Sequence, residues 1–260
     1  MRSREYAMYE PPRPRRLIVA LHGFSQHAAA WRARARLDEL GAAAEAVMVY
    51  PQAVRTNWIA RPTWWRTNRD LAYLDYLIDL CGAAYHFGPR DTFLAGLSDG
   101  ADMAALYAAE RSQRIAGAIV YAGGLLKRGP LDLPGRPAML FVRGERDHLV
   151  RDPKVADARE RLFAAGCPVA ELAAPGGHRW DPAMNPAIAG WVRTVHASLA
   201  VEPAAARCAR VGHGVGGPPG ALDSGLDAWR ARQQARALAE GAEFSRRARG
   251  DGFRLPRQGG

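Results

Sequence analysis

The 260 residues suffice for one substantial hydrophobic core, or for one core with an appendage, and 48% of them are hydrophobic. The formal net charge of +10 would suit a nucleic-acid-binding surface, but the basicity is almost all arginine alongside abundant alanine, so we interpret it as a compositional bias and expect no nucleic-acid partner. No apolar run reaches membrane-spanning length, the N-terminus lacks a signal-peptide core, and three cysteines in no disulfide or metal-ligand pattern indicate reduced thiols; together these predict a cytoplasmic protein without a metal.

The first part of the chain alternates apolar runs with helical patterns. Residues 4–9 alternate weakly and predict a first strand, whereas the continuous apolar runs 17–21 and 46–50 are typical of strands buried on both faces of a parallel sheet. Between these runs, residues 28–40 have helical spacing and are expected to end at Gly41. The order of strand, helix and strand predicts a parallel sheet with crossover helices.

A long loop over residues 51–69 separates these elements from a predicted helix at 70–84. The loop carries Trp58, Trp64 and Trp65 among arginines. Either these rings pack the loop onto the domain, or some of them line an apolar substrate cleft, because loops at the catalytic edge of open sheets carry binding groups.

An apolar run at residues 92–97 leads into the pattern Gly96-Leu97-Ser98-Asp99-Gly100 and then into a helical pattern. This is the layout of a nucleophile elbow, in which a serine sits on a sharp strand-to-helix turn. The turn closes only if the positions two before and two after the serine lack bulk, and both are glycine here. The pattern predicts Ser98 as a nucleophile beside the positive end of a helix.

Further strands are predicted at 115–121, 137–142 and 169–173, with helices at 152–166 and 186–199. Asp147 and His178 each follow one of these strands. A serine needs an imidazole to take its proton and a carboxylate to fix the tautomer of that imidazole, and we expect His178 and Asp147 in these roles. Asp152 is the alternative acid, and His148 and His196 are the alternative bases.

The order Ser98, Asp147, His178 resembles that of the α/β-hydrolases, and the resemblance covers most of residues 4–199. Within that superfamily the chain is similar to small esterases grouped with polyhydroxybutyrate depolymerases and feruloyl esterases, on the segments Leu21-His22-Gly23, Val49-Tyr50-Pro51, the elbow and Gly176-Gly177-His178-Arg179-Trp180. The resemblance implies an α/β fold with a mostly parallel central sheet flanked by helices. It also implies serine esterase activity on a small-molecule ester, with no metal or organic cofactor.

Two backbone N–H groups are expected to form an oxyanion hole, that of Phe24 after the first buried strand and that of Asp99 after the nucleophile. His22 is expected to shape the loop before Phe24 rather than to transfer protons. Trp180, together with the three tryptophans of the 51–69 loop, is a candidate substrate contact.

Composition divides the chain near residue 200 into a hydrolase domain at 1–200 and a low-complexity tail at 201–260, rich in Gly, Pro, Ala and Arg. The tail begins as a flexible linker, and the spacing of Leu222, Leu226 and Trp229 predicts a marginal helix around 222–240. Two alternatives stay open. The same triad could serve an acyltransferase, a thioesterase or a peptidase, and the protein could instead be a non-catalytic binding protein that acts through its basic tail.

Overall fold

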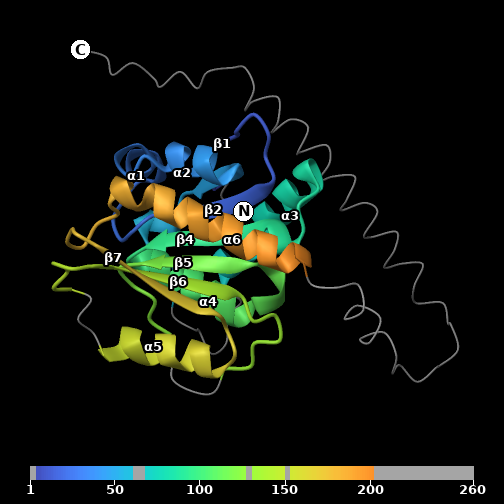
Figure 1. Ribbon diagram of the computed structural model, residues 1–260. Coiled ribbons are helices and arrows are strands. Elements are labelled where there is room, and N and C mark those ends of the chain that lie inside the picture. The colour runs from blue at the N-terminus through green and yellow to red at the C-terminus, as the bar shows by residue number, and fades with distance from the viewer. Residues whose placement is uncertain (1–3, 61–67, 127–130, 150–152, 202–260) are drawn as a thin grey trace, which may run out of the picture.

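A computed structural model of the chain describes residues 4–60, 68–126, 131–149 and 153–201 (Figure 1). The predicted tail, with its helix around 222–240, lies outside these residues, so the proposed division at residue 200 stays a prediction. Within the described ranges, none of the helices combines the length and the hydropathy that a membrane span requires.

Seven strands of the described chain form one sheet in the order β1-β3-β2-β4-β5-β6-β7. Strand β1 pairs antiparallel with β3, and all the other neighbours are parallel. The predicted mostly parallel α/β sheet is therefore confirmed. The strands are β1 (Tyr6–Tyr9), β2 (Arg16–Leu21), β3 (Ala46–Pro51), β4 (Thr92–Leu97), β5 (Gly117–Tyr121), β6 (Ala138–Gly144) and β7 (Val169–Ala174).

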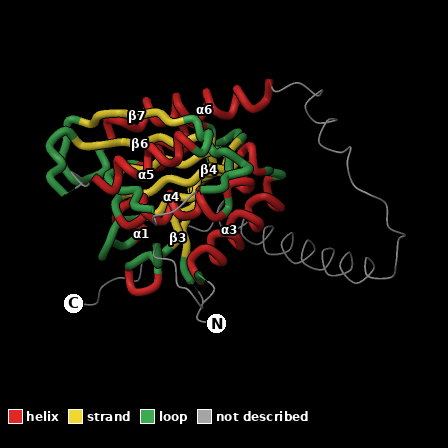
Figure 2. Tube along the Cα trace, turned by 90° about the horizontal axis from the view of Figure 1, so that it is seen from below, coloured by secondary structure: helices red, strands yellow, loops and turns green. Residues whose placement is uncertain are grey.

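Helices cover both faces of this sheet, which Figures 1 and 2 show as a three-layered arrangement. One face packs against α1 (Ala28–Arg34), α2 (Leu37–Ala44) and α6 (Asn185–Val201). The other face packs against α3 (Arg69–Tyr85), α4 (Asp99–Glu110) and α5 (Pro153–Ala164). Single 3-10 turns join several of these elements: η1 (Val54–Thr56), η2 (Pro89–Asp91), η3 (Ser112–Arg114) and η4 (Pro182–Met184).

The core follows from the continuous apolar runs of the central strands. Successive side chains of a strand point to opposite faces, so Val19 joins the cluster under α3 and α4, and its neighbours Ile18 and Ala20 join the cluster under α1, α2 and α6. All three side chains are fully buried. Burial on both faces is why these strands do not alternate between apolar and polar residues.

The predicted helix over 28–40 is wrong in its boundaries. Arg36 has a left-handed φ of 49° and separates α1 from α2, and α2 continues through Gly41 to Ala44. Gly41 faces strand β3, where an added Cβ would lie 2.5 Å from Cγ of Met48. The glycine is thus needed for close packing of a helix on the sheet and not for helix termination.

The parallel strands bring their carboxyl ends to the same edge of the sheet. Loops that leave β2, β4, β6 and β7 therefore meet there, although the residues that they carry are far apart in the sequence. This edge holds the loop after Leu21, the turn at Ser98 and the loops that carry Asp147 and His178.

Candidate active site

Ser98 lies on the sharp turn between β4 and α4, with φ 54° and ψ −117°. A positive φ is strained for a residue with a Cβ, and such strain persists only where the surroundings impose it. An added Cβ at Gly96 would collide with the backbone of Gly100, and one at Gly100 would collide with the carbonyl of Leu21. The two glycines therefore let strand β4, helix α4 and strand β2 approach closely enough to force this turn.

Hydrogen bonds hold the backbone of Ser98 in place. Its N–H donates to the carbonyl of Tyr121 at 2.9 Å, and its own carbonyl accepts the N–H groups of Ala101 and Asp102. Gly123 lies against the same carbonyl, since an added Cβ there would be 2.6 Å from the Ser98 oxygen. The turn is thus fixed from β5 as well as from its own helix.

The side chain of Asp102 ties helix α4 to the segment that follows β5. Its Oδ1 accepts the backbone N–H groups of Gly124 at 2.7 Å and Leu125 at 2.8 Å. The sequence pattern alone predicts no role for Asp102. Acidic residues are common in the first turn of helices because they interact favourably with the helix dipole. The position of Asp102 therefore does not distinguish it from any other aspartate at a helix start.

The structure brings Ser98, His178 and Asp147 into one hydrogen-bonded chain. His178 Nε2 lies 2.8 Å from Ser98 Oγ, and His178 Nδ1 lies 2.9 Å from Asp147 Oδ2. The Asp147 side chain is completely buried, whereas the His178 side chain is one-quarter exposed. Ser98 and His178 are thus both partly exposed, while the carboxylate of Asp147 is shielded from water.

The segments that carry Asp147 and His178 are bound to each other. The N–H of Arg146 donates to the Gly176 carbonyl at 3.0 Å, and its guanidinium Nε donates to the Pro175 carbonyl at 2.9 Å. An added Cβ at Gly144 would lie 2.5 Å from the Gly177 carbonyl oxygen. This close approach of two backbones sets the separation between the carboxylate and the imidazole.

The alternative bases lie elsewhere. His196 is on α6, where its Nε2 is 2.8 Å from Asp91 Oδ1 in the turn before β4, at the amino end of that strand. His148 is exposed, and no contact joins it to Ser98 in the described part of the chain. Asp152, the alternative acid, lies outside the described residues.

His22 is fully buried and bound within its own loop. Its Nε2 accepts the N–H of Ala53 at 3.1 Å, so its Nδ1 carries the proton and donates to the Gly23 carbonyl at 2.8 Å. Burial lowers the pKa of His22, which favours the neutral ring. These contacts fit a residue that shapes the loop before Phe24.

One expected oxyanion donor follows Ser98 directly, and the other lies in a loop that approaches the end of β4, since an added Cβ at Gly23 would be 3.4 Å from the Leu97 carbonyl oxygen. Asp99 is the first residue of α4, and the Phe24 side chain is 65% exposed in the loop after β2. Among the described residues, none accepts a hydrogen bond from the backbone N–H of Phe24 or of Asp99. Both N–H groups therefore have hydrogen-bonding capacity to spare.

The Asp99 side chain and Trp58 join the elbow to the loop after β3. Asp99 Oδ2 accepts the backbone N–H of Trp58 at 2.7 Å, and burial raises the pKa of this carboxyl group. The Trp58 indole N–H donates to the His22 carbonyl at 2.9 Å, and the side chain is only 5% exposed. Trp58 thus packs its loop onto the domain next to the site rather than forming an open substrate wall.

Of the other predicted substrate contacts, Trp180 is buried, and Trp64 and Trp65 lie outside the described residues. Trp180 is 4% exposed, stacks on Tyr121 with ring centroids 4.7 Å apart and donates its indole N–H to Asn185 Oδ1 at 2.8 Å. Its ring belongs to the core beneath the His178 loop.

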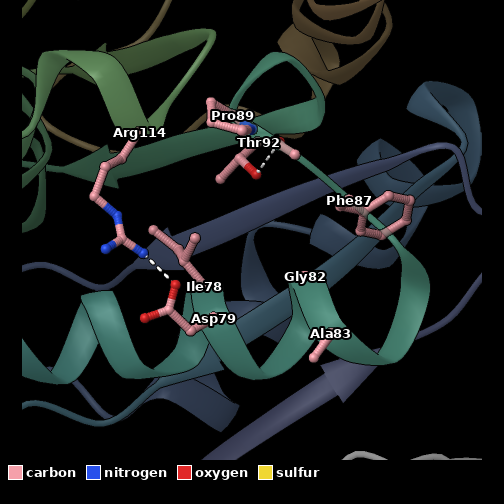
Figure 3. A pocket seen from close by; sticks show the side chains of 9 residues that line it. Ile78, Asp79, Gly82, Ala83, Phe87, Pro89, Thr92 and Arg114 are labelled. Carbon is pink, nitrogen blue, oxygen red and sulfur yellow. Dashed lines mark hydrogen bonds and ion pairs between the residues drawn. The ribbon is translucent and has the colours of Figure 1, made fainter. Parts of the chain in front are cut away.

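Two cavities lie at different ends of the sheet. One of about 280 Å³ is lined by the carboxyl ends of β5 and β6 and by α5, on the side of Ser98. The other, of about 360 Å³, is lined by the end of α3, by Thr92 at the start of β4 and by Arg114 (Figure 3). Because the second cavity lies at the amino end of β4, it is separate from the site around Ser98.

The chain has an α/β-hydrolase fold. No protein-family model matches its sequence, and no curated protein matches it significantly. Solved structures do match the fold. The chain is similar to esterase PE8, with 20% identity and a TM-score of 0.57 over 74% of this chain and 99% of that chain. It is also similar to the Bacillus cereus carboxylesterase, with 16% identity and a TM-score of 0.58 over 75% and 95% of the two chains. A ferulic acid esterase matches with 16% identity and a TM-score of 0.56 over 75% and 92%.

Proposed function

We propose that the protein is a serine hydrolase that cleaves a small carboxylic ester through Ser98, His178 and Asp147. The observation that carries this proposal is the hydrogen-bonded chain of these three side chains at the strained turn between β4 and α4. A serine that lies within hydrogen-bonding distance of an imidazole, itself oriented by a buried carboxylate, is the arrangement that activates a hydroxyl for attack. The names of the similar solved structures, which are esterases, favour an ester as substrate.

In the first half of the reaction, His178 Nε2 takes the Ser98 proton as Oγ forms a bond to the ester carbonyl carbon. The buried Asp147 carboxylate holds the Nδ1 proton and stabilises the imidazolium that forms. Negative charge develops on the carbonyl oxygen, where the backbone N–H groups of Phe24 and Asp99 donate to it. His178 then returns the proton to the leaving alcohol as the carbon–oxygen bond breaks.

Water completes the cycle on the acyl-enzyme. His178 takes a proton from the water as its oxygen attacks the acyl carbon, and then protonates Ser98 Oγ as the carboxylic acid leaves. Every proton moves between the substrate, water, Ser98 and His178. The proposed reaction therefore uses no cofactor.

The substitution Ser98→Ala tests this function. We expect kcat/KM for a short-chain nitrophenyl ester to fall by roughly four to six orders of magnitude, because the nucleophile is removed. Thermal unfolding followed by circular dichroism should show that the variant keeps its fold, since alanine fits wherever serine does. Turnover near the wild-type rate in the folded variant would rule out Ser98 as the nucleophile.

A further inference from the structure

The cavity of about 280 Å³ lies between helix α5 and the carboxyl ends of β5, β6 and β7. Part of its lining is apolar and includes Val120, Phe141 and Val155. Three charged side chains also line it, namely Arg143, Arg159 and Glu171. A cavity with apolar walls and a few polar groups is the usual form of a small-molecule site.

The cavity adjoins the backbone of the proposed nucleophile. Gly123 lines it and also lies against the Ser98 carbonyl, with an added Cβ only 2.6 Å from that oxygen. Hydrogen bonds connect Ser98 to Tyr121, and Ala122 to Val142 at the end of β6. Arg143 thus stands two strand spacings from Ser98, or about 10 Å between backbones. An arginine side chain and a short substrate chain together cover that distance.

The charges of the lining do not cancel. Arg159 and Glu171 form an ion pair at 2.7 Å, so they neutralise each other. Arg143 is exposed, and its guanidinium has no hydrogen bond or ion pair with any residue in the described part of the chain. The lining therefore carries one uncompensated positive charge next to its apolar part. Such a charge favours an anionic ligand, since guanidinium groups pair with carboxylates through two parallel hydrogen bonds.

We propose that the substrate of Ser98 is an ester that carries a carboxylate, and that Arg143 binds this carboxylate while the chain next to it occupies the cavity. The inference rests on the proposed serine hydrolase function and adds the substrate class. Arg143 is a specificity-determining residue in this account. Its guanidinium does not touch the bonds that form or break.

The test compares pairs of nitrophenyl esters in which one member carries a free carboxylate and the other has it masked or lacks it. In one pair the acyl group is glutaryl, either with its free carboxylate or as the methyl ester. In the other pair the acyl group is butyryl, and the leaving nitrophenol either carries a carboxylate or lacks it. We expect wild-type kcat/KM to favour the carboxylate in at least one pair by about tenfold or more, the size of a charge-assisted hydrogen bond.

The variants Arg143→Gln and Arg143→Glu test whether Arg143 causes the preference for the ester with a carboxylate. The ratio of kcat/KM within the preferred pair should fall to about 1 in the first variant and below 1 in the second, because charge is first removed and then reversed. Arg34→Gln is the matched control, since Arg34 is exposed on α1 on the other face of the sheet and its loss changes the net charge equally. This control should keep the wild-type ratio.

Two results would overturn the assignment of Arg143. One is a wild-type enzyme that turns over both members of each pair equally well, and the other is a preference that persists in Arg143→Gln. Failure of the underlying hydrolase function is a different result, because then no ester in either pair would be turned over and a fluorophosphonate would not label Ser98.

Discussion

Asp147 uses its two carboxylate oxygens for two different tasks. Oδ2 is 2.9 Å from His178 Nδ1, and Oδ1 accepts the backbone N–H of Leu149 at 2.9 Å. The second bond fixes the orientation of the carboxylate, and therefore which oxygen faces the imidazole. The buried side chain thus acts as a rigid acceptor for one specific N–H group.

The substitution Asp147→Asn tests that role while it preserves the shape of the side chain. An amide N–H toward His178 would favour the tautomer in which Nε2 carries the proton, so Nε2 could no longer accept the proton of Ser98. We expect kcat to fall by about 10⁴-fold at neutral pH, the size of effect known for this change in an unrelated serine protease. The measurement is ester turnover, with circular dichroism as a check of the fold. A loss smaller than tenfold would mean that Asp147 does not orient the base.

At the residue scale, the sequence predicted the three side chains that the structure brings together, because each follows a strand of a parallel sheet. It did not predict which way the tryptophans face. Trp58 and Trp180 are buried, and an indole in an irregular segment has no periodicity that distinguishes core packing from substrate contact. Tertiary contacts with His22 and Tyr121 decide their positions.

At the scale of elements, the contact between the end of β6 and the His178 loop sets the geometry of the site. Gly144 faces the carbonyl oxygens of Gly177 and Gly176. A Cβ added at Gly144 would lie 2.5 Å from the first oxygen and 2.7 Å from the second. Backbone atoms cannot rotate aside as a flexible side chain can. A larger residue at position 144 must therefore push the loop and its histidine away from Asp147.

Gly144→Ala tests this contact. We expect kcat/KM to fall by about 100-fold, the cost of a displacement of roughly 1 Å at a reacting group. Gly190→Ala is the matched control, because an added Cβ there meets nothing within 4 Å and the residue lies inside helix α6. The control should keep full activity and gain about 0.5–1 kcal/mol in the free energy of unfolding, measured with urea. Full activity in Gly144→Ala would show that the contact does not position His178.

The elements themselves were largely predictable, since continuous apolar runs and helical spacing are local properties. Helix α3 spans Arg69–Tyr85 and strand β3 spans Ala46–Pro51, close to the expected 70–84 and 46–50. Gly41 shows where local rules fail. A glycine after an apolar stripe is a common helix end, but here it makes room for Met48 of the neighbouring strand. That reason depends on a contact between elements.

At the scale of the whole molecule, the described part of residues 4–201 contains the seven-stranded sheet, helices on both of its faces and the three residues proposed to catalyse the reaction. Helix α6 is anchored near its end, where the Arg90 guanidinium donates to the Leu199 carbonyl at 2.9 Å. We therefore expect residues after 201 to contribute little to the fold or the site.

Truncation after Val201 tests this expectation. The shortened chain should give the same circular dichroism spectrum and the same kcat/KM as the full chain, because no described contact of the site is removed. An aggregated or inactive product would show that the tail belongs to the folded enzyme. Loss of activity with an unchanged spectrum would place part of the tail in the active site.

The order of strands and helices along the chain predicted the class of fold, because few topologies accommodate alternating buried strands and helices. The antiparallel place of β1 beside β3 did not follow from its weak alternation. The partner and direction of β1 depend on which strand lies at the edge of the sheet formed by the other strands. That order is a property of the folded molecule and not of the local sequence.

Labelling with a fluorophosphonate probe, read by intact mass on wild type and on Ser98→Ala, shows directly whether Ser98 is an activated nucleophile. An activated serine displaces fluoride and keeps the phosphonyl group, which adds one defined mass. We expect a single adduct on the wild-type chain and none on the folded variant. Wild-type protein that is folded but unlabelled would contradict this expectation, as would an adduct that persists without Ser98.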